Sequence, residues 1–298
     1  EVHCCCLRRR QREAQMPEFN DKRLVRPEGK PSAHQVAGPV ISLLETPVPN
    51  SRLATQVLHG EIVDVFAEQD GYCLVQCRRD RYVGWMLREG LSDALLAPSH
   101  KVIAARTYSY SAPDLKSAPV HLLSHGVRLA VSGTEGDWLH ADRAGWVHLK
   151  HVAPVNAFAG DPVSIAEMFL HTPYLWGGRQ SLGLDCTGLT QQAFEACGVH
   201  LPRDSDMQYA WLGADIEDWR QSGILKRGDL VFWKGHVGIM TDAEHLLHAN
   251  AWHMEVACEP LDSAIERIAN DYAEPIGARR IDVSKQQGRM PQWLESVA

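Results

Sequence analysis

One cysteine, Cys186, lies between a glycine-rich loop and a predicted amphipathic helix, and two histidines follow it on predicted strands. Asp185 is a residue type that caps helix N-termini, and the apolar spacing over 187–196 indicates a helix that Gly198 would end. A cysteine in the first turn of a helix lies at the positive end of the macrodipole, where free N–H groups favour the thiolate and can bind an oxyanion. The pattern therefore predicts a thiol nucleophile.

The strand pattern places the two histidines. Apolar runs at 236–240 and 245–248 are typical of strands, and a turn centred on Asp242 would set His236 directly opposite His248. We therefore expect a Cys-His-His triad in which His236 pairs with the thiolate and protonates the leaving amine, while His248 orients it. A slip of one residue would put the two rings on opposite faces.

Other interpretations of these residues exist. A lone cysteine is usually a small buried apolar group, and a strand histidine is usually structural, but the combination with the glycine loop and the N-cap argues against both. One cysteine and two histidines could also hold zinc, yet no close-spaced ligand pair accompanies them. We predict no metal and no cofactor.

The composition describes an ordinary globular protein of 298 residues, with 45% hydrophobic and 22% charged residues, long enough for two or three domains. No apolar run approaches the length of a membrane span. The formal net charge of −7 favours neither nucleic acid nor an anionic membrane as a partner. Small peptides are compatible with this charge.

Cysteine usage and the first residues bear on the compartment. The eight cysteines, scattered unevenly, do not form a disulfide framework for a chain of this size, which favours a reducing compartment. Residues 1–15 contain three cysteines and an arginine run but no apolar core of a secretory signal. We therefore expect a cytoplasmic protein, with Met16 as a possible true start.

Residues 38–154 are rich in short β-type runs and repeat themselves. His59-Gly60 recurs as His125-Gly126, an offset of 66 residues (59 to 125), and an aromatic residue recurs at the same offset as Tyr72 and Trp138. Two small β-barrels in tandem would produce this pattern.

Five motifs in the second half resemble the NlpC-type papain-like cysteine peptidases. They are PYLWGG at 173–178, LDCTGL at 184–189, LPRDS at 201–205, RGDLVF at 227–232 and GHVGI at 235–239. The resemblance implies a papain-like endopeptidase that cleaves peptidoglycan (murein) stem peptides, commonly between γ-D-glutamate and the diamino acid. Thr187 stands where the family usually has serine, and Asp204 where many members have threonine.

The repeated region resembles bacterial SH3-type domains, since Gly60-Glu61 precedes alternating apolar residues and a terminal Gly-Trp follows at 84–85. Two such modules before an NlpC-type domain are similar to the γ-D-glutamyl-L-diamino-acid endopeptidases of murein recycling. In those enzymes the first module recognises a free N-terminal L-alanine. The resemblance implies a substrate such as L-Ala-γ-D-Glu-diaminopimelate.

The same resemblance implies roles for residues around the nucleophile. Glu61, Tyr82 and Asp185 would bind the free amine, which an acetylated peptide lacks. The plain alternatives are a solvated strand-edge charge for Glu61 and a barrel aromatic for Tyr82. The full set of expected substrate-binding residues is Glu61, Tyr82, Tyr174, Asp185, Thr187, Asp204 and Ser205, with Tyr174 near the scissile carbonyl.

The expected fold class is α+β, a papain-like catalytic domain preceded by two SH3-like β-barrels. The expected boundaries are a flexible arm at 1–32, barrels at 33–98 and 99–155, the peptidase domain at 156–283 and a loose tail at 284–298. Two other functions stay open: a non-catalytic protein that binds murein fragments, and a Cys-His acyltransferase. The intact cysteine and histidines argue against the first, and the SH3-type modules argue against the second.

Overall fold

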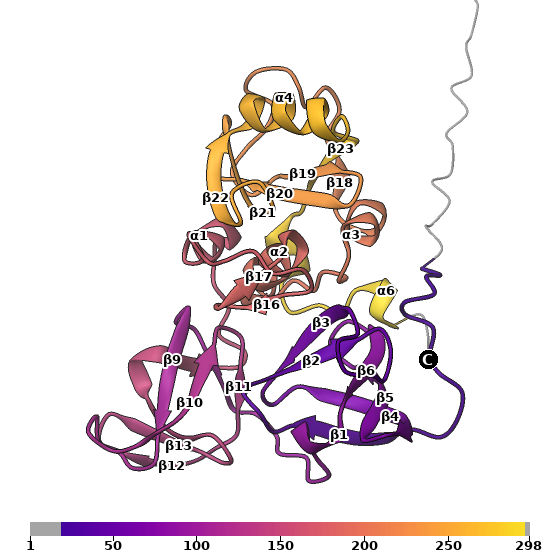
Figure 1. Ribbon diagram of the computed structural model, residues 1–298. Helices are drawn as coiled ribbons and strands as arrows, with labels where there is room; N and C mark the ends of the chain where they lie inside the picture. Colours follow the sequence, from indigo (N-terminus) through magenta and orange to yellow (C-terminus); the bar gives the residue numbers. More distant parts are fainter. Residues whose placement is uncertain (1–18, 296–298) are drawn as a thin grey trace, which may run out of the picture.

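The structure, a computed structural model, describes residues 19–295. Two small β domains lie side by side, and a third domain of helices and strands packs above them (Figure 1). The expected start at Met16 and the cysteines at 4–6 lie outside the described residues. Within the described residues, no helix is both long enough and apolar enough to cross a membrane.

The first β domain is one antiparallel sheet that curls around its own core. Alternate side chains point inward, so that Val63, Val75 and Met86 are fully buried. Its strands, which pair in the order β3-β2-β6-β5-β4-β1-β7, are β1 (Ser32–Val36), β2 (Val40–Leu44), β3 (Leu53–Leu58), β4 (Ile62–Gln69), β5 (Tyr72–Cys77), β6 (Val83–Leu87) and β7 (Leu91–Ser92).

The second β domain has two sheets around a separate core that includes Leu123, Leu129 and Val147. The larger sheet has the order β10-β9-β14-β13-β12, and the smaller has β11-β8-β15. The strands are β8 (His100–Val102), β9 (Arg106–Tyr110), β10 (Pro119–Ser124), β11 (Arg128–Leu129), β12 (Val131–Glu135), β13 (Trp138–Ala141), β14 (Gly145–His148) and β15 (Val152–Pro154).

The sequence repeat has a structural counterpart in the two β domains. His59 hydrogen-bonds through Nδ1 to the carbonyl of Ala37 at 2.9 Å, and His125 makes the same bond to Ile103 at 3.1 Å. The glycine after each histidine is in the left-handed region, with φ of 81° and 80°. The offset of 66 residues therefore relates the two histidines and also the two residues whose carbonyls they contact, Ala37 and Ile103.

The third domain is built on a six-stranded antiparallel sheet of order β18-β23-β19-β20-β21-β22. Helix α2 covers one face and α4 the other, because successive residues of β19 point to opposite sides. Its elements are α1 (Pro162–Glu167), β16 (Arg179–Gln180), β17 (Gly183–Leu184), α2 (Cys186–Ala196), α3 (Ser205–Trp211), β18 (Ala214–Asp215), β19 (Leu230–Trp233), β20 (His236–Met240), β21 (His245–Asn250), β22 (Glu255–Pro260), α4 (Leu261–Asp271) and β23 (Gly277–Arg280).

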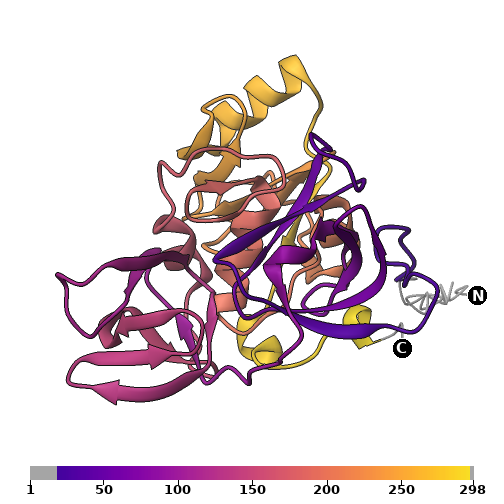
Figure 2. The ribbon, with the colours of Figure 1, turned by 60° about the horizontal axis from the view of Figure 1, so that its bottom comes forward.

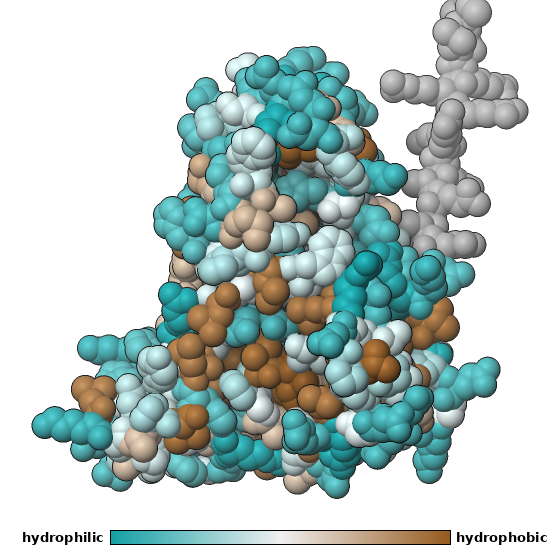
Figure 3. All heavy atoms as spheres, viewed as in Figure 1, coloured by the Kyte–Doolittle hydropathy of each residue, from teal (hydrophilic) through white to brown (hydrophobic). Residues whose placement is uncertain are grey.

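The first β domain docks on the third through β3, which lies against β16 (Figure 2). The backbone N–H of Arg179 donates to Gln56 at 3.0 Å, and its guanidinium donates to the carbonyl of the same residue at 2.8 Å. Apolar residues gather on the surface where β2, β10 and β11 approach the third domain (Figure 3). The three domains therefore form one body around these contacts.

Both segments that we expected to be loose are packed where the structure describes them. Leu24, in the expected arm at 1–32, is 3% exposed within the core of the first β domain. The expected tail contains α5 (Val283–Gln286) and α6 (Gln292–Glu295), and Trp293 is 2% exposed and stacks on Trp211 at 6.3 Å. Further contacts hold the first segment, since Phe19 also packs on Trp211 and Arg23 pairs with Asp204. Such long-range contacts offset the entropy of ordering a segment, and composition alone does not show them.

Candidate active site

Cys186 is the first residue of α2, and Asp185 caps that helix as predicted. The Asp185 carboxylate accepts hydrogen bonds from the backbone N–H of Gly188 at 2.7 Å and of Gly177 at 2.8 Å. It also forms an ion pair with the buried guanidinium of Arg203 at 2.7 Å. The glycine loop is therefore tied to the helix N-terminus by one carboxylate whose two oxygens are both in use.

Glycine is required where the loop and the first turn of α2 come close to each other through their backbones. A Cβ at position 188 would lie 2.1 Å from the carbonyl oxygen of Gly178, a distance that no side chain tolerates. Gly177 has a φ of 77°, in the left-handed region. The loop can therefore pass directly over the first turn of α2 and hold the cysteine at the cleft surface.

Burial governs the protonation of the nucleophile. Burial raises the pKa of the Cys186 thiol, and the nearby Asp185 charge raises it further. The backbone amide of Val237, the Arg203 charge and the amide of Thr187 act in the opposite direction but do not cancel the rise in pKa. In the substrate-free protein this balance favours the neutral thiol, whereas the helix position alone had led us to expect a thiolate.

The histidines form a hydrogen-bonded chain that ends on a carboxylate. His236 Nε2 and His248 Nδ1 are 2.8 Å apart, and His248 Nε2 lies 2.8 Å from Oε1 of Glu259. Glu259 also pairs with Arg267 of α4. Glu259 was not among the residues predicted from the sequence, because the predicted strands end before β22, on which it lies.

The strand register differs from the predicted one. Ile239 pairs with Leu247, which extrapolates along the strands to Gly238 opposite His248, so the two histidines are diagonal neighbours and not directly opposed. The difference is two residues, and side chains on a strand alternate with a period of two. Both rings therefore stay on the same face, within reach of each other.

Burial lowers the pKa of His236 to about 3, with smaller contributions from His248 and from the Arg267 charge. The pKa of His248 is lowered too, again mainly by burial, and the Glu259 carboxylate opposes that change. Both rings are therefore neutral near pH 7, and a neutral imidazole is a proton acceptor.

Cys186 lies in a cleft of about 440 Å³ between the first β domain and the third domain. Of the residues expected to bind substrate, six line this cleft: Tyr82, Tyr174, Asp185, Thr187, Asp204 and Ser205. The structure thus brings together side chains from both domains around the nucleophile. Asp185 and Thr187 are engaged with each other, at 3.1 Å, and with Arg203, so their side chains shape the loop.

Tyr82 and Asp204 are joined across the domain boundary. The Tyr82 hydroxyl donates to Oδ2 of Asp204 at 2.9 Å, and Arg23 donates to the same oxygen at 2.8 Å. Burial raises the pKa of Asp204, although Arg203 and Arg23 oppose the change. Arg23 was not a sequence candidate, because it falls in the segment that we expected to be a flexible arm.

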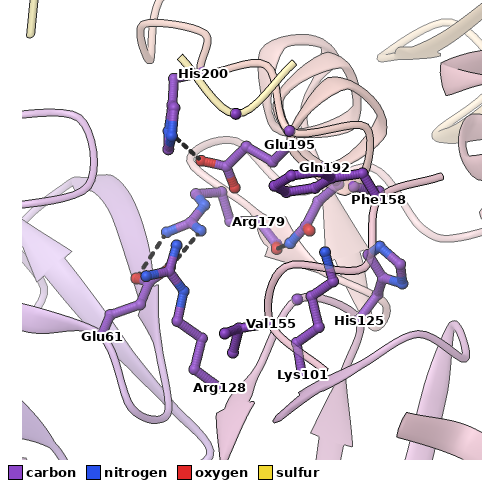
Figure 4. Close-up of a pocket in the computed structure, with 14 residues that line it drawn as sticks. Glu61, Lys101, His125, Arg128, Val155, Phe158, Arg179, Gln192, Glu195 and His200 are labelled. Atoms are coloured by element: carbon purple, nitrogen blue, oxygen red, sulfur yellow. Dashed lines mark hydrogen bonds and ion pairs between the residues drawn. The ribbon is translucent and has the colours of Figure 1, made fainter. Parts of the chain in front are cut away.

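Glu61 is not in the cleft, which corrects our expectation that it binds the substrate amine. Its carboxylate is 6% exposed and forms a two-pronged ion pair with Arg179, with distances of 2.8 and 3.1 Å (Figure 4). It lines a different cavity, of about 230 Å³, that shares no lining residue with the Cys186 cleft. Among the described residues of the first β domain, the acidic residue that lines the cleft is Glu45.

The chemistry of this constellation agrees with the comparisons with known proteins. The NlpC/P60 family matches residues 171–270, and the bacterial dipeptidyl-peptidase SH3 domain matches residues 43–91. Residues 171–270 are an NlpC/P60 domain. The protein is therefore a peptidase of the hydrolase class with an SH3-like β domain before its NlpC/P60 domain. The SH3 character of the second β domain stays a prediction, because the SH3 match covers the first β domain.

Curated relatives span most of the chain. Dipeptidyl-peptidase 6 of Lysinibacillus sphaericus is 26% identical over 261 residues, which cover 80% of this chain and 94% of the relative. The gamma-D-glutamyl-L-lysine dipeptidyl-peptidase of Bacillus subtilis is 29% identical over 219 residues, or 66% of this chain and 72% of the relative. The crystal structure of an NlpC/P60 family protein from Bacillus cereus has a TM-score of 0.69 at 21% identity, covering 84% of this chain and 99% of that one. This likeness confirms the expected papain-like fold.

Proposed function

We propose that this NlpC/P60 protein is a cysteine peptidase that hydrolyses the γ-D-glutamyl–diamino acid bond of murein peptides with a free N-terminal L-alanine. The observation that carries the proposal is the contact between the backbone amide of Val237 and the thiol of Cys186. Val237 follows His236 on β20, so the strand that bears the first histidine of the hydrogen-bonded pair lies against the nucleophile. The gamma-D-glutamyl-L-lysine dipeptidyl-peptidase of Bacillus subtilis and a relative of the same name from Bacillus cereus, 26% identical over 263 residues, support the choice of bond.

The proposed mechanism uses the histidine chain as base and orienter. His236 donates from Nε2 to His248, which leaves Nδ1 to accept the thiol proton as Cys186 attacks the γ-glutamyl carbonyl. His236 then gives that proton to the leaving amine, and a thioester forms. Water, activated by the same nitrogen, hydrolyses the thioester and regenerates the thiol. His248 and Glu259 hold the required tautomer throughout.

Neutral resting groups fit this sequence of steps. Because burial favours the neutral thiol and the neutral imidazole, proton transfer accompanies attack, when the oxyanion gains stabilising contacts. Asp185 already accepts from the Gly188 N–H, so we assign the developing oxyanion to the backbone N–H of Cys186, the first of α2, which has no helical carbonyl before it. Tyr174 lines the same part of the cleft.

The cleft suggests how a free amine is recognised. Glu45, Asp204 and Asp206 line it, and a substrate ammonium would form charge-assisted hydrogen bonds with such carboxylates. Asp204 and Asp206 already pair with Arg23, so an N-acetylated peptide would lose only the additional charge-assisted bonds that a substrate ammonium makes. We assign the amine contact to Glu45 and to the Tyr82–Asp204 pair, in place of the buried Glu61.

The experiment that tests this function is mass spectrometry of L-Ala-γ-D-Glu-meso-diaminopimelate after incubation with the protein. The expected products are L-Ala-γ-D-Glu and free diaminopimelate, with no product from the N-acetylated peptide or from the Cys186→Ala variant. EDTA should leave turnover unchanged, because no step needs a metal. Binding of the peptide without cleavage would favour a binding protein, and a ligated product with an added amine would favour acyl transfer.

A further inference from the structure

A third histidine, His253, lies beside the His248–Glu259 pair. His253, Glu259 and His248 each offer one ligand atom, and these atoms lie within 4.8 Å of one another. The His248 and His253 ring centroids are 6.4 Å apart. Cys186 and His236 do not belong to this group of described residues, so it differs from the zinc site considered from the sequence.

The chemistry and access of this group suit a zinc ion. Two imidazoles and one carboxylate, with water as fourth ligand, are a common donor set for Zn²⁺. Nδ1 of His253 lies 3.0 Å from Oδ1 of Asn250, which also accepts from the backbone N–H of His253. An amide oxygen can only accept, so Nδ1 carries the proton and Nε2 is a free ligand. His253 is exposed, which gives an ion a route to the buried His248.

Three adjustments would admit the ion. His253 would move closer to the other two ligands, because the three ligand atoms lie within 4.8 Å of one another and a zinc site needs about 3.3 Å. Tetrahedral ligands of zinc lie about 3.3 Å apart, whereas His248 Nε2 and Glu259 Oε1 are 2.8 Å apart, so this contact would open by roughly half an ångström. Arg267 would also leave Glu259, because the metal repels its charge. Its guanidinium already lies 5.2 Å from the Trp252 ring centroid, which can retain it.

We propose that Zn²⁺ binds His248, His253 and Glu259 and reversibly inhibits the peptidase by reversing the tautomers of the histidine chain. The inhibitory part of this inference rests on the proposed cysteine mechanism, in which His236 must present an unprotonated Nδ1. The binding part rests on the geometry of the three ligands alone.

The proton positions follow from the ligand atom. Without metal, His236 holds its proton on Nε2 and donates to His248, which holds its own on Nε2 and donates to Glu259. A neutral imidazole that binds zinc through Nε2 must hold its proton on Nδ1. His248 then becomes the donor to His236, whose proton must move to Nδ1. Neither ring gains or loses a proton, but the base facing Cys186 can no longer accept one.

The test measures zinc binding and activity in the full-length chain. Cys4→Ser, Cys5→Ser and Cys6→Ser are introduced first, because three adjacent thiols can themselves bind zinc. Isothermal titration with ZnCl₂ is then carried out on this parent protein and on its His253→Ala and His245→Ala variants. His245 is a matched control: it pairs with Asp242 at 3.0 Å and is not one of the three ligands.

We expect zinc to bind one site and to inhibit cleavage. We also expect it to slow the alkylation of Cys186 by iodoacetamide, which is monitored by mass spectrometry. His253→Ala should weaken both binding and inhibition by about tenfold or more, with unchanged turnover before zinc is added, while His245→Ala should behave as the parent. EDTA should restore activity. Equal zinc inhibition in His253→Ala and the parent would overturn the proposal and place the metal elsewhere, such as on Cys186. The titration and the alkylation still decide the matter if the murein peptide is not a substrate.

Discussion

Replacement of Glu61 by glutamine should destabilise the protein and leave its affinity for substrate unchanged. The Glu61 carboxylate is buried against Arg179, with Arg79 3.6 Å away and the backbone N–H of Leu58 at 3.0 Å. Glutamine keeps the shape of the side chain but removes the charge that compensates two buried guanidinium groups. The cost comes mainly from Arg179, because Arg79 keeps its ion pairs with Asp80 and Glu195.

Two routes give the size of this effect. Arg179 is the main group that lowers the pKa of Glu61, from 4.5 to about 2, against the opposing effect of burial. This fall of the Glu61 pKa from 4.5 to about 2 corresponds to about 3 kcal/mol of stability near neutral pH. Removal of one partner of a buried ion pair typically costs about 3–5 kcal/mol, which agrees with the value from the pKa.

The sign of the pH dependence follows from the lowered pKa. A carboxyl group whose folded-state pKa is depressed stabilises the fold above its unfolded pKa, and this contribution is lost as pH falls through the folded value. The stability difference between the parent and Glu61→Gln should therefore be largest above pH 5. It should shrink as the pH falls from about 4.5 toward 2.

The assay is urea denaturation followed by tryptophan fluorescence, together with steady-state kinetics on the free murein peptide. The control is Glu45→Gln, which removes an exposed carboxylate that lines the Cys186 cleft. We expect the two variants to behave in opposite ways: Glu61→Gln loses about 3 kcal/mol with unchanged KM, and Glu45→Gln keeps its stability with a raised KM. A normal denaturation midpoint with a raised KM in Glu61→Gln would refute the assignment of Glu61 to the ion pair.

Three further predictions concern the cleft and the histidine chain. Glu259→Gln should lower kcat about ten- to a hundredfold, the value of one charge-assisted hydrogen bond to His248, without loss of substrate binding; a rise in KM alone would contradict this. Tyr82→Phe should raise KM several-fold and cost about 1 kcal/mol in urea denaturation, because Asp204 loses one hydrogen bond; unchanged kinetics would exclude Tyr82 from the substrate site. Because burial holds the pKa of His236 well below 6.5, the acid limb of kcat/KM should lie below pH 6.5, and a limb at or above that pH would show that the free enzyme holds a charged imidazole.

Local sequence signals predicted the elements that carry the nucleophile and its base. The N-cap at Asp185, the helix α2 and the strand β20 lie where capping preference and apolar periodicity place them. Each depends on residues within one or two turns or within a single strand. Such elements can be inferred without knowing what packs against them.

Elements that depend on distant partners were wrong or missing. The register of β20 and β21 differs by two residues from the prediction, because pairing on both sides of β21 contributes to it and β22 was not foreseen. Glu259 lies on β22, opposite Leu246, and was missed for the same reason. A glutamate in a strand pattern resembles a solvated edge residue until its neighbouring strand is known.

The sequence by itself determined the candidate nucleophile, its helix, the two candidate histidines and the position of an SH3-like β domain before the NlpC/P60 domain, because short-range patterns and motifs encode them. Only the tertiary structure decided which carboxylates meet which cations. Glu61 pairs with Arg179, across 118 residues of chain, and Tyr82 reaches Asp204 across 122. Burial, and with it the protonation of the thiol and of His236, is likewise a property of the assembled domains. Electrostatic partners act through distance in space and through excluded water, and neither quantity is a function of position along the chain.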